Sequence, residues 1–160
     1  MENLIHIVYD WIIEIWVRII GIVMLTCILL QIFTRAFFKL PFPWTDELAR
    51  FAFIWFCLMG SVMTMRRNLH LGIDYFESKM SPRVKRYNRI GIQSLIIVFG
   101  LFIGIFGIQL LGIVKVQTSV VMRMPMTWVY VALPTAGFLY ALLGVNGLAL
   151  YLKGKKEGSV

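Results

Sequence analysis

The chain has 160 residues, and its composition excludes an ordinary soluble globule. Hydrophobic residues make up 59% of it and charged residues 15%, and 16 Lys and Arg against 8 Asp and Glu leave a formal net charge of +8. A globule of this length exposes too much surface to hide so much apolar side chain, so lipid is the expected solvent. The basic residues fall between long apolar runs, which indicates membrane orientation signals and no nucleic-acid partner.

The first apolar run, residues 19–34, becomes long enough to cross a bilayer if its helix extends over residues 11–35. Trp11 and Trp16 suit the headgroup layer at the start of this range, and Arg18 can snorkel toward it. The segment before it is acidic where a secretory signal is basic. We therefore expect a retained, uncleaved membrane anchor.

The second span is predicted over residues 44–66, after a connector whose prolines stop the preceding helix. Thr45 is placed to cap the new helix, and Asp46 and Glu47 fall in its first turn, where acidic groups are favourable. Asp46 and Arg50 are four residues apart and can form an ion pair.

The connector to the third span carries most of the basic residues. Residues 71–80 place apolar side chains on one helical face, which predicts a short amphipathic helix on the membrane surface. Ser81 and Pro82 are typical of a helix start, so the third span is predicted over residues 82–115. Small residues on one face of this span indicate close helix packing, at Gly100, Gly104 and Gly107.

The fourth span is predicted over residues 125–152. Pro134 removes the backbone hydrogen bond to Tyr130 and should bend this helix, and a structural kink is favoured over a moving hinge. No repeat or linker divides the chain, so residues 1–160 are expected to form a single transmembrane domain.

The distribution of Lys and Arg predicts the orientation in the membrane. Counted by side of the membrane, 11 of the 16 basic residues go with the termini and the central connector, namely Arg18, seven residues of segment 66–89 and three of the C-terminal tail, and five go with the opposite side. The positive-inside rule then places both termini and the central connector in the cytoplasm. The predicted fold class is an all-α integral membrane protein with four transmembrane helices and a short amphipathic helix on the cytoplasmic side.

Reactive chemistry is not indicated by the residue pattern. Cys27 and Cys57 lie in apolar runs without a CxxC or CxxH neighbour, and we interpret both as small core hydrophobes. No nucleophile–base set, metal-ligand spacing or glycine-rich phosphate loop occurs in the sequence. We therefore expect no enzymatic activity and no cofactor bound by this chain.

Two other classes of membrane protein stay open. Paired histidines can ligate haem in the membrane anchor of a respiratory oxidoreductase, but His6 and His70 both lie outside the apolar runs. A structural anchor without haem belongs to the same class. A self-contained small exporter is the other alternative, although the middle of every run lacks the charged residues that transporters usually carry there.

One part of the sequence has a specific resemblance. The stretch Trp44-Thr-Asp-Glu-Leu-Ala-Arg50 is followed by an apolar span, Arg66, Arg67, His70 and Asp74. In this order and spacing it resembles the small membrane subunit of tripartite ATP-independent periplasmic (TRAP) transporters, the DctQ-like family. Gln31 and Arg35, and residues 124–130 with Pro134, are similar to that family's pattern too. Asp46 departs mildly, since the family often has Glu there.

The resemblance implies a four-helix subunit of the bacterial inner membrane with both termini inside. It implies a large multi-span permease as partner, which would hold the solute and sodium sites, and a periplasmic binding protein that delivers carboxylate solutes. This subunit would brace the static scaffold of an elevator-type permease, contact membrane lipids and help to dock the binding protein. Sodium is accordingly expected in the large subunit and not in this chain.

The resemblance and the charge pattern together define candidate interface residues. Asp46, Glu47 and Arg50 are expected to fix the outer end of the second helix against the large subunit or the binding protein. His70 and Asp74 are expected to fix the surface helix, with Arg66 or Arg67 as partners. The full set of interface or motif residues is Arg35, Trp44, Asp46, Glu47, Arg50, Arg66, Arg67, His70, Asp74 and Pro134.

Overall fold

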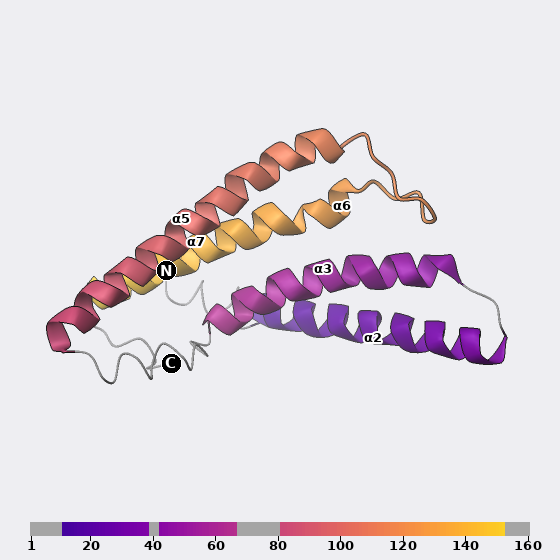
Figure 1. The fold of residues 1–160 in the computed structure, drawn as a ribbon, viewed down its shortest axis with the longest axis horizontal. Helices are drawn as coiled ribbons and strands as arrows, with labels where there is room; N and C mark the ends of the chain where they lie inside the picture. Colours follow the sequence, from indigo (N-terminus) through magenta and orange to yellow (C-terminus); the bar gives the residue numbers. More distant parts are fainter. Residues whose placement is uncertain (1–10, 39–41, 67–80, 153–160) are drawn as a thin grey trace.

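The computed structural model describes residues 11–38, 42–66 and 81–152, and these residues are predominantly helical (Figure 1). Four of the helices are long and apolar enough to cross a membrane. The helices are α2 (Glu14–Phe37), α3 (Pro43–Arg66), α5 (Pro82–Val114), the short α6 (Thr127–Tyr130) and α7 (Ala132–Leu152). The all-α class and the number of spans are confirmed, whereas the side of the membrane on which the termini lie stays a prediction. The predicted surface helix at residues 71–80 lies outside the described residues.

Helices α2 and α3 form one antiparallel hairpin (Figure 1). A Cβ atom at Gly21 of α2 would lie 2.9 Å from the Phe56 ring of α3, so the glycine makes room for this ring. The apolar span that contains α2 begins at Trp11, as predicted, and continues to Phe37, two residues beyond the predicted end. Its first turns are supported by an ion pair between Glu14 and Arg18.

Helices α5 and α7 form the second hairpin, and their backbones approach closely. A Cβ atom at Gly137 of α7 would lie 2.5 Å from the Gly104 nitrogen and 2.8 Å from the Gly100 oxygen. On the same face, a Cβ atom at Gly107 would lie 2.9 Å from the Pro134 ring. The small-residue face predicted on the third span is therefore confirmed, and α7 is the helix that packs on it.

Helix α5 begins where the sequence predicts. Ser81 has extended backbone angles (φ −65°, ψ 152°), and Pro82 takes the first helical position, where its missing N–H costs no hydrogen bond. The Ser81 side chain makes no capping hydrogen bond, so Pro82 is the main local feature that fixes the start of the helix. The helix ends at Val114, one residue before the predicted limit.

The fourth span is not one continuous helix. It divides at Val131 into α6 and α7, and regular helix begins at Thr127 instead of residue 125. Pro134 lies in the first turn of α7, where it has no N–H to donate to the Tyr130 carbonyl. This lost bond accounts for an interruption one turn before the proline, where the sequence predicted a bend.

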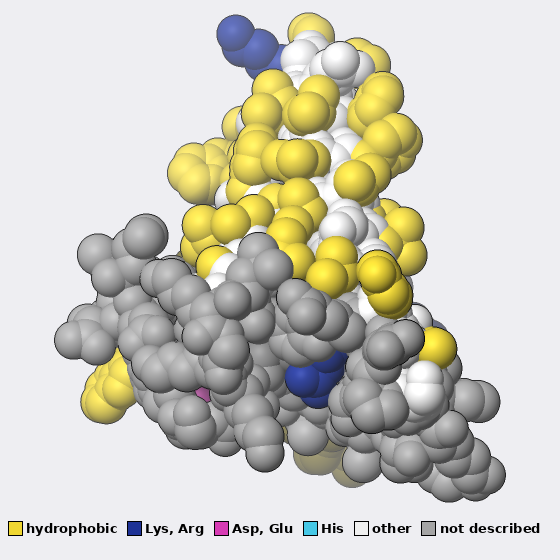
Figure 2. All heavy atoms as spheres, turned by 90° about the vertical axis from the view of Figure 1, so that its left-hand side faces the viewer, with side chains coloured by type: hydrophobic (Ala, Val, Ile, Leu, Met, Phe, Trp, Pro, Cys, Tyr) yellow, Lys and Arg dark blue, Asp and Glu magenta, His cyan; other side chains and the backbone are white. Residues whose placement is uncertain are grey.

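The buried core is small and lies where α3 meets α7 and the start of α2. Its members are Ile13, Met59, Val62, Met63, Ala136 and Leu143. Many large apolar side chains elsewhere on the helices are exposed, and Figure 2 shows hydrophobic side chains covering the upper part of the molecule, where α5 and α7 lie. Such surface is expected where lipid or other membrane helices form the surroundings.

The two cysteines have different surroundings. Cys27 of α2 is buried, as predicted. Cys57 of α3 is exposed, so its assignment to the core was wrong. Cys57 shares one face of α3 with Ser61 and Thr64, which are exposed too. An apolar run alone does not reveal which of its faces the rest of the chain covers.

Candidate functional site

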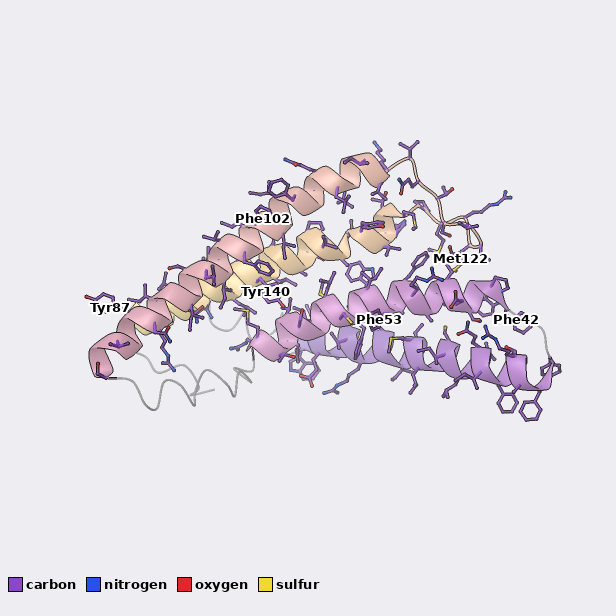
Figure 3. The ribbon with its side chains drawn as sticks, viewed as in Figure 1. Phe42, Phe53, Tyr87, Phe102, Met122 and Tyr140 are labelled. Carbon is purple, nitrogen blue, oxygen red and sulfur yellow. The ribbon has the colours of Figure 1, made fainter. Side chains whose placement is uncertain are left out.

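Several of the predicted site residues gather at one end of the bundle. Here α2 ends, α3 begins, and residues 115–126, which we call the α5–α6 loop, connect α5 with α6 (Figure 1). Met122 lies between this loop and α3 in Figure 3. Groups from three separate parts of the sequence therefore meet in one place.

An exposed polar cluster links the two helices of the first hairpin. Gln31 of α2 donates from its side-chain nitrogen to one Asp46 oxygen at 3.2 Å. Arg50 donates to the other Asp46 oxygen at 2.5 Å, which confirms the predicted ion pair. The side chains of Arg50 and Asp46 are 68% and 52% exposed, so the pair contributes little to stability and stays open to a partner. Arg35 lies nearby in the last turn of α2 and is exposed as well.

Thr45 does not cap α3 as the sequence suggested. The helix begins two residues earlier, at Pro43, so Thr45 already lies within its first turn. Its side chain is completely buried, and its hydroxyl donates to the Phe42 carbonyl at 2.7 Å. Trp44 beside it is 42% exposed, as an aromatic side chain at a membrane boundary is expected to be.

Glu47 has partners within its own chain. Its two carboxylate oxygens accept backbone N–H groups from Val120 at 3.2 Å, Val121 at 3.2 Å and Met122 at 2.7 Å. Three successive amides directed at one carboxylate form a compact anion site. In this structure the Glu47 oxygens are bound to the α5–α6 loop. The predicted contact of Glu47 with another protein stays a prediction.

The α5–α6 loop is held by further hydrogen bonds of its own. The Ser119 N–H donates to the Met124 carbonyl at 2.9 Å, and the Met124 N–H donates to the Ser119 hydroxyl at 3.3 Å. The Met126 N–H donates to the Gln117 carbonyl at 3.0 Å. Arg123 in the turn has φ of 53°, a conformation that few non-glycine residues adopt. The loop thus has a defined fold that directs the amides of its tip toward α3.

A further hydrogen bond also links the two hairpins, and the sequence did not predict it. The Trp55 indole N–H on α3 donates to the Trp128 carbonyl on α6 at 3.1 Å. The Trp16 ring of α2 meets the Trp55 ring edge-on, with 6.3 Å between ring centres. The only sequence signal was a tryptophan in the middle of an apolar run, which ordinary core packing would also explain.

The other predicted residues fall into two groups. Pro134 packs against the face of α5 near Gly107, so in this structure its contact is an internal one. Arg66 lies in the last turn of α3. Arg67, His70 and Asp74 lie outside the described residues, as does His6. The contacts predicted between the surface helix and Arg66 or Arg67 therefore stay a prediction.

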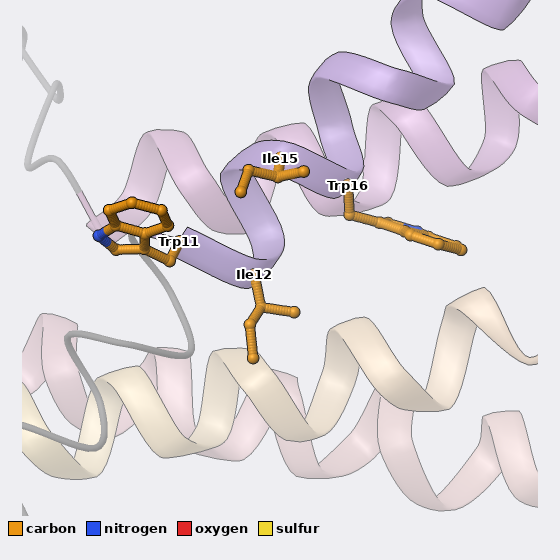
Figure 4. A pocket seen from close by; sticks show the side chains of 4 residues that line it. All are labelled: Trp11, Ile12, Ile15 and Trp16. Atoms are coloured by element: carbon orange, nitrogen blue, oxygen red, sulfur yellow. The ribbon is translucent and has the colours of Figure 1, made fainter.

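An open apolar hollow lies at the opposite end of the first hairpin. It is lined by Trp11, Ile12, Ile15 and Trp16, and Figure 4 shows their side chains around the first turns of α2. Trp11 and Ile12 are 69% and 59% exposed. The lining is almost entirely apolar, which suits lipid tails or an apolar protein surface and not a polar solute.

Comparisons with known proteins match most of the chain. Residues 24–153 match the family described as tripartite ATP-independent periplasmic transporters, DctQ component. The chain is 24% identical over 127 residues to the sialic acid TRAP transporter permease protein SiaT of Haemophilus influenzae, over 79% of this chain and 21% of that protein. It is 27% identical over 112 residues to the sialic acid TRAP transporter small permease protein SiaQ of Vibrio cholerae, over 67% of this chain and 62% of that protein. The chain thus spans about a fifth of the first relative and less than two thirds of the second.

Proposed function

The chain belongs to the DctQ component family of tripartite ATP-independent periplasmic transporters, and from this premise we propose that it braces the static scaffold of a large multi-span permease in the bacterial inner membrane. The observation that carries the proposal is the match over residues 24–153, which includes all the described helices except the first turns of α2. The family is a membrane component of transporters, so the chain is not an enzyme.

The SiaT relative supports a large membrane partner. In that protein the matched region is about a fifth of a longer permease chain, so a homologous segment is covalently part of a bigger membrane body. The small core and the exposed apolar faces of this chain suit the same arrangement, because helices that bury little among themselves have surface left for lipid and for other helices.

The proposed solute is a carboxylate, taken up together with sodium. Both relatives are named for sialic acid, which is itself a carboxylate. The solute and sodium sites belong to the large subunit in this proposal, and the chain described here carries neither. Its contribution is mechanical, because a fixed scaffold lets a mobile domain of the partner carry the solute across the membrane.

The exposed end of the first hairpin is the proposed docking position for a periplasmic binding protein or for the large subunit. Arg35, Asp46 and Arg50 present both signs of charge there without being buried. Complementary charges on a partner would steer its approach and fix its orientation more than they would add affinity. With both termini in the cytoplasm, this end of the bundle faces the periplasm.

Gentle affinity purification from the native membrane tests the proposal. We expect a large multi-span permease in roughly stoichiometric amount, and an absorption spectrum without a haem Soret band. Recovery of this chain alone, or only as a homo-oligomer, would contradict the subunit proposal and favour a self-contained exporter. A Soret band together with a soluble dehydrogenase would instead favour the anchor of an oxidoreductase.

A further inference from the structure

Glu47 and the α5–α6 loop join the two helical hairpins. Glu47 stands on α3 in the first hairpin, and its partners lie 73 to 75 residues later, in the connection within the second hairpin. One oxygen accepts the Val120 N–H, and the other accepts the N–H groups of Val121 and Met122. A contact between groups so far apart in the chain restricts how the hairpins lie relative to each other at this end.

The loop supplies no backbone acceptor of its own for these three amides. Its neighbouring N–H groups are already used, since Ser119 and Met124 bond to each other and Met126 bonds to Gln117. A carboxylate is a suitable acceptor for these three N–H groups, because its two oxygens only accept hydrogen bonds and its negative charge strengthens each bond. Glutamine has nearly the same shape but only one acceptor oxygen, and its NH₂ group would face N–H donors.

The conformation of the loop indicates that it depends on such a restraint. Arg123 has φ of 53°, which a non-glycine residue retains when surrounding contacts hold it there. Val116 and Val120 are 89% and 90% exposed, so apolar packing of these side chains does not hold the loop. Hydrogen bonds to Glu47 and within the loop therefore hold it, together with the buried Ser119 and the half-buried Met122.

We propose that Glu47 is a positioning residue whose carboxylate holds the α5–α6 loop in one conformation against α3 and thereby sets the spacing of the two hairpins at this end of the bundle. This role is internal to the chain and does not depend on the proposed transport function. It also explains why neighbouring acidic residues are not equivalent, since Asp46 contacts Gln31 and Arg50 on the first hairpin.

Hydrogen–deuterium exchange of the full chain, purified with whatever subunits accompany it, tests the contact directly. In Glu47→Gln, we expect peptides that contain Val120, Val121 and Met122 to exchange at least about tenfold faster, because their amides lose a charged acceptor. Asp46→Asn is the matched control, since it removes a charge one residue away, and it should leave these peptides unchanged. Equal exchange in Glu47→Gln and the unmodified chain would overturn the proposal.

A distance measurement tests the positioning role itself. Spin labels at Val116 in the loop and Phe53 on α3, in a chain without Cys27 and Cys57, should give one narrow distance distribution that broadens in Glu47→Gln. Met122→Pro, which removes the N–H donor of the shortest of the three hydrogen bonds, should broaden the distribution too. It should add little further broadening to Glu47→Gln in the double variant.

The hydrogen-exchange experiment also tests whether the role of Glu47 is local. If exchange in Glu47→Gln became equally faster throughout the α5–α7 contact, a local role would be contradicted, because Glu47 would then support the whole bundle.

Discussion

At the scale of single residues, neighbouring side chains at the start of α3 have separate tasks. Asp46 pairs with Arg50 on its own helix, whereas Glu47 reaches three amides of the α5–α6 loop. Spacing along a helix predicted the first contact, because residues four positions apart face each other. Nothing in the local sequence indicated the second, since its donors are backbone groups whose direction depends on how the loop folds.

Trp55 allows the second link between the hairpins to be tested. Trp55→Phe keeps an aromatic ring but removes the N–H that donates to the Trp128 carbonyl. We expect a loss of about 1 kcal/mol in unfolding free energy, the usual net contribution of one hydrogen bond. Thermal unfolding followed by circular dichroism in one detergent measures it. Trp44→Phe, at an exposed position on the same helix, is the control and should change stability much less.

At the scale of elements, each hairpin is built differently. In α5 and α7, glycines bring the two backbones together, whereas in α2 and α3 one glycine makes room for an aromatic ring. The third span's glycine spacing predicted a packing face, and the structure adds that Gly137 of α7 meets Gly100 and Gly104 on it. The sequence did not identify α7 as the partner, because small residues occur on other spans as well.

Gly137→Ala tests the backbone contact. The new Cβ atom would lie 2.5 Å from the Gly104 nitrogen and 2.8 Å from the Gly100 oxygen, and neither backbone atom can move away as a flexible side chain could. We expect a loss of about 1–3 kcal/mol, the usual range for overpacking. Gly112→Ala on α5, where a Cβ atom would meet nothing within 4 Å, should not destabilise the chain. Equal unfolding temperatures for the two variants would contradict this view of the interface.

At the scale of the whole molecule, the described residues contain four helices long and apolar enough to cross a membrane. Four crossings predict that the start of α2 and the end of α7 lie on the same side. The basic residues predict that this side is the cytoplasm. The polar cluster and the α5–α6 loop would then both lie on the periplasmic face. The proposed docking role depends on this orientation, because a periplasmic partner can reach only that face.

Cysteine labelling in intact cells tests the orientation. In a chain without Cys57, a cysteine at Val120, which is 90% exposed in the α5–α6 loop, should react with a membrane-impermeant maleimide added from outside. A cysteine at Val84, which is 52% exposed near the start of α5, should react only after the inner membrane is opened. The reverse pattern would overturn the predicted topology and with it the periplasmic docking role.

Four spans, the helix start at Ser81 and Pro82, the Asp46–Arg50 pair and the glycine face of α5 could all be predicted from the sequence. These features depend on residues close together in the chain. Helical spacing, backbone angles and the need for apolar side chains in contact with lipid are enough to predict them. Three features became visible once the helices were packed together: Glu47 binds the α5–α6 loop, Trp55 donates to the Trp128 carbonyl, and Cys57 is exposed. Those outcomes depend on which faces of distant helices meet, and periodicity within one segment carries no information about its neighbours.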